Sequence, residues 1–394
     1  MKHSKATRRS RVGLVAVAAL ATLIVSACSS SDSSGGTDAS DGSSSASGDY
    51  TATAQKAVDA AYKGLYSEPT AGGPKAQTGK NIWVVPCSTA LFGCSEPAAA
   101  VKEAAKTLNW DITIADGKAS PAGYTSAINQ AIAAKADGII TVAIDCVAAK
   151  SSLAAAKKAG IPTVSVFAYD CDDPKSGATE PLYSATINSS GTPAEFGTTW
   201  GVLKADYAIA KTGGKAKVLL ITHPDFIVTQ YETAGYKDEL AKCGGCEIVA
   251  TVDITGADLG NPAVTAQKVA TALQQHPEAT VVDAPDDTTM AEISQVITAA
   301  RRPDLVVVAG EGYPSTLALI KNKVVTAAGG VPANWLGWEG ADAMNRVLAG
   351  ETKIPNQGAS FQIIDAENGM PSETDAPWTP TVDYKSVFTA NWAG

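Results

Sequence analysis

From residue 80 onward, short apolar runs alternate with longer segments whose apolar residues recur at helical spacing. The runs with the length of buried strands are 81–86, 111–115, 138–144 and 162–167. The segments with helical spacing between them are 96–108, 124–135 and 148–159. Strands separated by helices of about 10–15 residues form right-handed βαβ units on a parallel sheet. The pattern therefore predicts one doubly wound α/β lobe.

The same alternation restarts after an extended stretch at 183–187 and predicts a second lobe. Its strands are expected at 216–222, 247–253, 280–284 and 305–309, and its helices at 193–211, 228–242, 262–276, 288–300 and 314–322. Weaker patterns follow, with helices at 333–348 and 384–392 and an extended stretch at 360–365. Ligands bind beyond the carboxyl ends of the strands of such sheets. Two lobes that face each other would enclose one cleft.

The first 79 residues have a different pattern. Arg8, Arg9 and Arg11 precede an apolar run at 12–25, which is shorter than the roughly 20 residues of a membrane-spanning helix, so residues 1–27 are predicted to be a secretory signal. The run ends in Val25-Ser26-Ala27-Cys28, which resembles a bacterial lipobox with Cys28 as the lipidated residue. An ordinary cleavage site that contains a cysteine is the alternative. The Ser- and Gly-rich residues 28–49 predict a flexible tether, and 50–79 a helix at 51–66 followed by a loose linker.

Charge narrows the choice of partner. The signal contains five of the 31 Lys and Arg residues and none of the 40 Asp and Glu residues, so the mature chain has a formal net charge of −14. An acidic chain without a basic block has nothing to follow a phosphate backbone, and we expect no nucleic-acid partner. The lipid on Cys28 would be the only membrane anchor, because no second apolar run is long enough to span.

Six cysteines remain after Cys28, and an even number in an exported chain predicts disulfides. Six cysteines allow 15 pairings, among which the sequence alone does not choose. Local spacing favours Cys87 with Cys94 and Cys243 with Cys246, which leaves Cys146 and Cys171 on two loops expected to be neighbours. Cys243-Gly-Gly-Cys246 follows a helix rather than starting one, which favours a structural bond over a redox pair.

The sequence offers little for catalysis. His223 and His276 have no partners at zinc-ligand spacing, and a structural role is expected for both. There is no phosphate-binding loop, nucleophile elbow or complete dinucleotide motif. Asp286, Asp287 and Glu311 suggest paired carboxylates, but hydrogen bonding to a ligand or helix capping explains them more simply. We therefore expect no enzyme activity, cofactor or metal.

Several segments together carry a family resemblance. They are Ala136-Asp137-Gly138-Ile139-Ile140, Ala159-Gly160-Ile161-Pro162-Thr163-Val164, Ala234-Gly235-Tyr236 and Ile187-Asn188. With the lipobox and tether, about residues 80–348 resemble the type I periplasmic-binding proteins of ABC importers, the ribose/galactose-binding family. The resemblance implies two doubly wound, Rossmann-like lobes joined by a three-crossing hinge near residues 188, 330 and 355. The lobes would comprise 80–187 plus 332–355, and 188–331 plus 356–394 with the tail.

The resemblance also implies a ligand site. Ser88, Thr89 and Phe92 follow the first strand, Asn188 matches the hinge asparagine, Asp286 and Asp287 match a polar pair, and Glu311 matches the usual aspartate. Phe167, Tyr169 and Phe226 are further candidates, with Trp335 and Trp338 expected in the first lobe's core. Phe167-Ala168 replaces the Asp-Arg pair of sugar binders, and the arginine expected after Pro224 is missing. These departures remove charged groups that hold sugar hydroxyls.

The expected function is an extracytoplasmic, lipid-anchored solute-binding protein of an ABC importer. It would act as a monomer, capture a carbohydrate-like small molecule by hinge closure, and deliver it to permease subunits. The alternatives are a binding protein for an aromatic, apolar or cationic small molecule and a ligand-sensing module for a membrane receptor.

Overall fold

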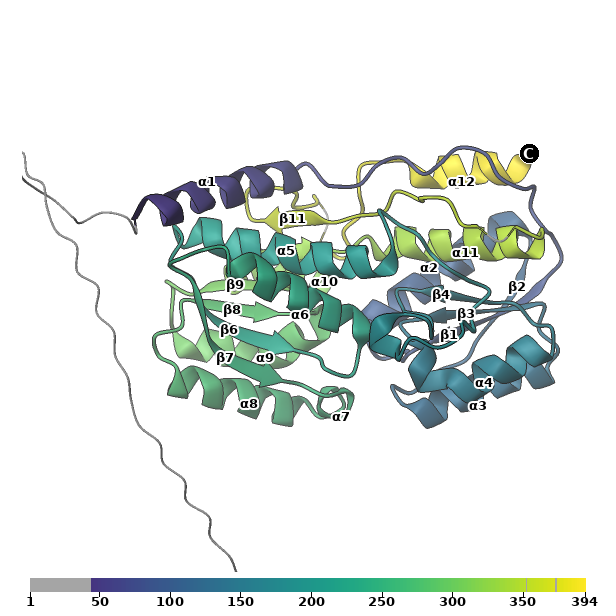
Figure 1. The fold of residues 1–394 in the computed structure, drawn as a ribbon, viewed down its shortest axis with the longest axis horizontal. Helices are drawn as coiled ribbons and strands as arrows, with labels where there is room; N and C mark the ends of the chain where they lie inside the picture. Colours follow the sequence, from purple (N-terminus) through teal and green to yellow (C-terminus); the bar gives the residue numbers. More distant parts are fainter. Residues whose placement is uncertain (1–43, 352, 373) are drawn as a thin grey trace, which may run out of the picture. The chain divides into compact units, whose positions relative to one another are not determined.

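The computed structural model describes residues 44–351, 353–372 and 374–394, and within them two α/β lobes (Figure 1). The first lobe contains a parallel sheet in the order β2-β1-β3-β4-β5. Its strands are β1 (Asn81–Pro86), β2 (Asp111–Ile114), β3 (Gly138–Val142), β4 (Thr163–Val166) and β5 (Ala185–Thr186). The helices α2 (Phe92–Leu108) and α11 (Ala333–Leu348) cover one face, and α3 (Pro121–Ala133) and α4 (Cys146–Lys158) cover the other. The doubly wound prediction is confirmed for this lobe.

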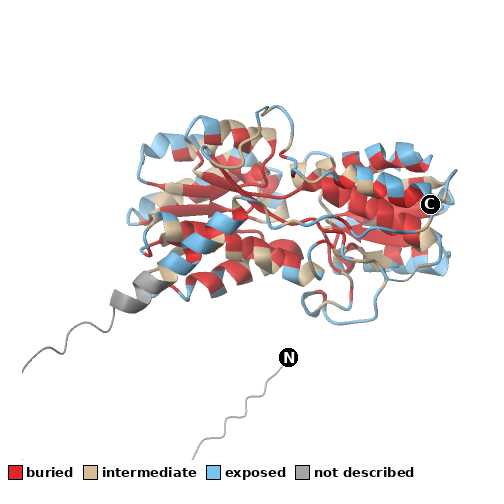
Figure 2. Ribbon diagram, turned by 90° about the horizontal axis from the view of Figure 1, so that it is seen from above, coloured by how far each residue is buried: buried red, intermediate tan, exposed pale blue. Residues whose placement is uncertain are grey.

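The second lobe repeats the plan with the sheet order β11-β10-β9-β8-β6-β7. Its strands are β6 (Lys217–Thr222), β7 (Glu247–Asp253), β8 (Val281–Ala284), β9 (Val306–Ala309), β10 (Ala327–Gly330) and β11 (Gln362–Asp365). Its helices are α5 (Pro193–Lys211), α6 (Ile227–Leu240), α7 (Gly256–Leu259), α8 (Pro262–Gln275), α9 (Asp287–Ala300) and α10 (Pro314–Lys321). All pairs are parallel except β10 with β11. Figure 2 shows both sheets buried beneath helices with exposed outer faces.

One strand was not predicted from the sequence. The strand β10 reads Ala-Ala-Gly-Gly and has none of the branched residues that mark a strand. Its glycines serve packing instead, because a Cβ added to Gly329 would lie 2.8 Å from Nε1 of Trp200. The Trp200 indole also donates a hydrogen bond of 3.0 Å to the Gly329 carbonyl. Close packing against the Trp200 ring therefore requires glycine in β10, and glycine hides the strand from a search for branched apolar residues.

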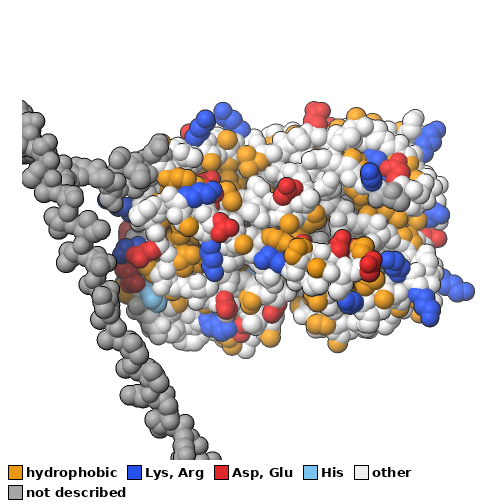
Figure 3. All heavy atoms as spheres, in the orientation of Figure 1, with side chains coloured by type: hydrophobic (Ala, Val, Ile, Leu, Met, Phe, Trp, Pro, Cys, Tyr) orange, Lys and Arg blue, Asp and Glu red, His pale blue; other side chains and the backbone are white. Residues whose placement is uncertain are grey.

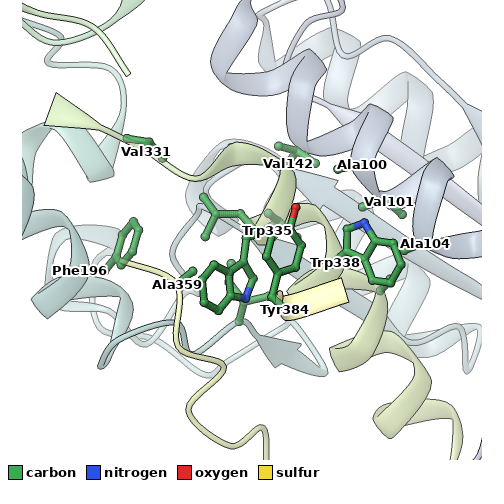
Figure 4. Close-up of a cluster of buried hydrophobic side chains, with 14 of the residues drawn as sticks. Ala100, Val101, Ala104, Val142, Phe196, Val331, Trp335, Trp338, Ala359 and Tyr384 are labelled. Carbon is green, nitrogen blue, oxygen red and sulfur yellow. The ribbon is translucent and has the colours of Figure 1, made fainter. Parts of the chain in front are cut away.

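The C-terminal tail divides between the lobes. Strand β11 joins the second sheet, but α12 (Tyr384–Ala393) packs on α11 of the first lobe (Figure 4). The Tyr384 ring stacks on Trp335 at 4.8 Å, and Trp392 stacks on Trp338 at 5.4 Å. Both α11 tryptophans lie in the first lobe's core, as expected. Within the predicted segment 356–394, β11 therefore belongs to the second sheet, and α12 lies against the first lobe.

The segment predicted to be a loose linker is bound to the hinge. Helix α1 (Ser44–Ala61) begins inside the predicted tether and packs on α5 of the second lobe. The next residues donate backbone hydrogen bonds, from Leu65 to Phe361 at 2.9 Å and from Ser67 to Gly358 at 3.0 Å. Farther along, the Ala76 amide bonds to the Trp392 carbonyl at 3.0 Å. The predictions for residues 1–43 lie outside the described residues.

The three expected crossings between the lobes are present, and hydrogen bonds join two of them. The amides of Gln357 and Gly358 donate to the carbonyls of Asn188 and Ser189, both at 2.8 Å. The buried carboxyl group of Glu339 on α11 contacts the Ser189 hydroxyl and accepts from the Ala359 amide at 3.1 Å. Burial raises the pKa of Glu339 to about 8.

The described residues include no helix that is both long and apolar enough to cross a membrane. On the face drawn in Figure 3, basic side chains lie among acidic ones. Both observations concern only this part of the chain.

We predict that Glu339→Gln reduces the loss of stability at alkaline pH. Because the pKa of Glu339 is raised on folding, its contribution is complete below the ordinary glutamate pKa and disappears as the pH rises through about 8. Glutamine keeps an acceptor and adds a donor without titrating. Urea unfolding at pH 5, 7 and 9 should show the wild type losing about 4 kcal/mol more than the variant over this range. The exposed Glu180→Gln is the control, and equal pH dependence in all three proteins would contradict the prediction.

Candidate ligand-binding site

A cavity of about 60 Å³ lies between the lobes, where the carboxyl ends of their strands meet. The first lobe lines it with Cys87, Leu91, Gly93, Cys94, Ala143 and Phe167. The second lobe contributes residues that include Trp200, His223, Phe226, Asp286, Thr288 and Glu311. The cavity is smaller than the roughly 300–1,000 Å³ typical of pockets for drug-sized ligands. This interlobe position is the one that the two-lobe pattern predicts.

Two first-lobe residues at the cavity have strained backbones. Ala143 follows β3 with φ of 52°, and Phe167 follows β4 with φ of 56°. Residues other than glycine in this left-handed region each cost about 1–2 kcal/mol. The turns direct the chain away from the sheet edge and place both residues against the cavity.

Disulfides shape the rim of the first lobe. The described residues contain the pairs Cys87–Cys94, Cys146–Cys171 and Cys243–Cys246, which match the pairing favoured by spacing. Cys87 and Cys94 are both cavity residues, so their bond forms part of the wall. The second pair joins the start of α4 to the loop after β4, since β3 and β4 are neighbours in the sheet.

Four of the ten predicted ligand residues line the cavity, namely Phe167, Phe226, Asp286 and Glu311. The loop after β1 contributes through different positions than expected. The Ser88 hydroxyl accepts a bond from the Ala90 amide at 3.1 Å, and the exposed Thr89 donates its amide to Asp116 at 3.0 Å. The Phe92 ring faces Tyr313 at 5.9 Å. Leu91, Gly93 and the disulfide occupy the wall instead, so the predicted loop is at the site but its predicted side chains are not.

Three other predicted residues have roles beside the cavity. Tyr169 stacks on Tyr231 of the second lobe at 5.1 Å and donates its hydroxyl to the Pro193 carbonyl at 2.8 Å. The Asn188 carbonyl belongs to the hinge hydrogen bonds described above. Asp287 is buried and accepts bonds from the Glu311 amide, and from the Ser315 hydroxyl and Thr316 amide, both at 3.3 Å. It therefore holds the loop that carries Glu311.

His223 and Asp286 form a buried pair at the cavity. The His223 Nδ1 lies 2.7 Å from the Ile254 carbonyl, which assigns the donor role to this nitrogen. Its Nε2 lies 2.6 Å from Asp286 and 2.8 Å from the Thr289 hydroxyl. Burial alone would lower the pKa of His223, but the Asp286 carboxylate and the Ile254 carbonyl raise it overall. Asp286 also caps α9 by accepting from the Thr289 amide at 2.7 Å.

Glu311 is the cavity carboxyl group that keeps an unbonded oxygen. It follows β9 between Gly310 and Gly312, whose φ values of 82° and 86° favour glycine, and its residue is 2 % exposed. Its Oε2 has no hydrogen-bond partner among the described residues. Burial raises the pKa of Glu311 well above its ordinary value, and the negative charges of Asp287 and Asp286 add to this effect. The protonated, neutral form of Glu311 is therefore favoured relative to a glutamate in water.

The sequence analysis missed three buried groups around the site. Trp200 on α5 lines the cavity, and Lys204 one turn later pairs with Glu232 at 2.6 Å and Asp283 at 2.8 Å. Asp145 accepts from the Tyr169 amide of its own lobe at 3.1 Å and from the Ile227 amide of the other lobe at 2.9 Å. Burial raises the pKa of Asp145 to about 6. The sequence did contain a signal for the Lys204 group, because a charged residue inside an otherwise apolar helix needs a buried partner.

Comparisons with known proteins agree with this architecture. A family model described as a periplasmic binding protein domain matches residues 84–352. A solute-binding protein from Burkholderia graminis, in complex with D-arabinose, has a TM-score of 0.64 at 20% identity and covers 76% of this chain and 99% of its own. A glucose-galactose binding protein from Geobacillus stearothermophilus has a TM-score of 0.63 at 19% identity, with 74% and 99% covered. A solute-binding protein from Agrobacterium vitis, bound with α-D-tagatopyranose, has a TM-score of 0.64 at 20% identity, with 75% and 97% covered. No curated protein matches the sequence.

We predict that Gly93→Ala impairs ligand binding without destabilising the fold. Gly93 lies in the first turn of α2, and a Cβ there would come 3.1 Å from Oε1 of Glu311 across the cavity. Alanine is a better helix former than glycine by about 1 kcal/mol, so the melting temperature should stay equal or rise. Calorimetry should show ligand affinity reduced about tenfold or more, since the methyl group displaces the Glu311 carboxyl group. Gly244→Ala, at an exposed position where an added Cβ would meet nothing within 4 Å, is the control for a glycine change without this contact. Unchanged affinity in Gly93→Ala would contradict the proposed geometry.

Proposed function

Because the chain belongs to the type I periplasmic-binding-protein family, we propose that it is an extracytoplasmic lipoprotein that captures a small molecule between its lobes and delivers it to an ABC permease. The resemblance recognised in the sequence is confirmed. The family consists of non-enzymatic solute-binding proteins. The proposal assigns the whole binding function to one monomeric chain.

The observation that carries the proposal is a cavity enclosed by both lobes, together with a hydrogen bond that joins them beside it. The Asp145 carboxylate of the first lobe accepts from the Ile227 amide in the first turn of α6 in the second. The Tyr169–Tyr231 stack and the Tyr169–Pro193 bond lie on the same side. Such contacts exist only while the lobes are together. A ligand that touches both walls stabilises this state by its differential affinity.

The ligand class is a separate matter from the mechanism. The neighbours named above are bound to, or named for, sugars. At about 20% identity they support the fold and not the ligand of this chain. The carbohydrate-like ligand expected from the sequence stays a prediction, and a panel of sugars, polyols, aromatic acids and amines tests it.

We predict that one class in this panel raises the melting temperature and draws the lobes together. At a ligand concentration 100 times the Kd, the folded state should gain about 2.7 kcal/mol. Small-angle X-ray scattering should show a smaller radius of gyration with the same compound. Asp145→Asn replaces one acceptor oxygen with an amide that opposes the Ile227 amide, and it should weaken binding about fivefold to tenfold. A hit that leaves the radius unchanged, with full affinity in Asp145→Asn, would refute capture by closure.

We also predict that Cys28 carries the lipid anchor, a prediction that concerns residues outside the described part of the chain. Cys28→Ala should prevent incorporation of labelled fatty acid and move the protein from the membrane fraction to the medium or periplasmic extract. One or two acyl chains supply the membrane affinity, so removing their attachment site leaves no strong anchor. Equal membrane retention by wild type and Cys28→Ala would show that another segment anchors the chain.

A further inference from the structure

The polar groups at the cavity are almost all committed to bonds within the protein. His223 uses both ring nitrogens, toward Ile254 on one side and toward Asp286 and Thr289 on the other. The Thr229 hydroxyl donates to the His223 carbonyl at 2.6 Å. Asp286 is occupied by His223 and by the α9 cap. A ligand therefore meets one uncommitted carboxyl group, that of Glu311, together with the Thr288 hydroxyl.

The charges around Glu311 favour a cation. Three nearby carboxyl groups raise the pKa of Glu311: Asp286 and Asp287 at the start of α9, and Glu232 on α6. The neighbouring Tyr313 is neutral and supplies no positive charge. The basic groups nearby, Lys204 and His223, are already paired with carboxylates. None of the residues that line the cavity is lysine or arginine. An anionic ligand would find no partner here.

The remaining walls are apolar and leave little space. Leu91, Phe167, Phe226, Leu259 and the Cys87–Cys94 bond line the cavity of about 60 Å³. A polyol bound here would strand most of its hydroxyl groups without partners, which lowers affinity. A compact apolar molecule with a single donor group would leave no polar group without a partner. The faces of Phe167 and Phe226 also attract a cation through their negative ring faces.

We propose that the ligand is a small apolar amine, bound as its ammonium ion against Glu311 with its hydrocarbon part between Phe167 and Phe226. The proposal rests on the proposed function and names the ligand class of that same site. It departs from the sugars to which the neighbours are bound.

Proton balance gives the proposal a specific signature. Without a neighbouring positive charge, burial and the adjacent carboxylates raise the pKa of Glu311 and favour its protonated form. An ammonium ion bound beside Glu311 lowers the pKa of that carboxyl group, so Glu311 ionises and its proton passes to the buffer. No bond in the ligand changes, and each binding event releases up to one proton. A neutral ligand bound at the same place would release none.

The test uses isobutylamine and isobutanol as probes, which share a carbon skeleton and differ in the charged group. Titration calorimetry at pH 7 in buffers of different ionisation enthalpy should detect binding of isobutylamine with net proton release. Isobutanol should bind at least tenfold more weakly and release no protons. Glu311→Gln should weaken isobutylamine binding about 10- to 100-fold and abolish the proton release. Glu292→Gln is the control, since Glu292 is a partly buried carboxyl group of the second lobe that does not line the cavity, has a raised pKa, and like Glu311 has an Oε2 without a hydrogen-bond partner among the described residues.

The outcomes separate the two proposals. Equal binding of isobutylamine by wild type and Glu311→Gln, or binding without proton release, would overturn the amine proposal. If only sugars or polyols bind and draw the lobes together, the ligand class is wrong and solute capture stands. If no compound of the panel binds, both proposals fail. Circular dichroism establishes that Glu311→Gln is folded, and Glu311→Asp, which keeps the charge on a shorter side chain, should retain proton release with intermediate affinity.

Discussion

The buried carboxyl group of Glu339 is the constraint on which the two-lobe architecture depends. It joins Ser189 in the first crossing to Ala359 in the third, while its own helix α11 directly follows the second. Gln357 extends the connection by donating to the Glu339 carbonyl and the Asp342 carboxylate, both at 3.1 Å. A network of buried polar groups is stabilising only when those groups have hydrogen-bond partners. Here the bonded groups belong to the segments that join the two lobes. The hinge is therefore fixed in position, although the lobes that it joins can rotate.

Two further segments limit how the lobes move. The stretch 62–79 follows the third crossing through Leu65 and Ser67, and α12 lies over α11 with its rings against Trp335 and Trp338. Together with the three crossings, they place five stretches of chain on the hinge side of the molecule. The opposite side, with Asp145 and Tyr169, carries side-chain contacts between the lobes and no crossing of the described chain. The position of the cavity between these two sides follows from the arrangement.

The sequence predicted the lobes far better than the site, and particular residues show why. Strands such as β1 and β7 and helices such as α5 and α11 were predicted with their exact bounds, because burial on a sheet or helix face imposes a period. Strand β10 was missed because packing against Trp200 requires glycine there. The packing of α12 on the first lobe depends on ring contacts between residues about 50 positions apart in the sequence, which no local pattern encodes. For the same reason the sequence placed Asp287 and Tyr169 at the ligand, whereas their partners in space hold a loop and an interlobe contact.

The backbone of the site places side chains from both lobes at one cavity. Left-handed turns at Ala143 and Phe167 lie on one side of it, and the Gly310-Glu311-Gly312 turn lies on the other. Most hydrogen-bonding groups there are used within the protein, because His223 and Asp286 are paired with each other and Asp287 holds the loop. The Glu311 carboxyl group, whose pKa is raised by burial and nearby carboxylates, keeps an unbonded oxygen. Since an unpaired buried carboxyl group is costly to ionise alone, the ligand that brings the missing positive charge gains the most from entering this cavity.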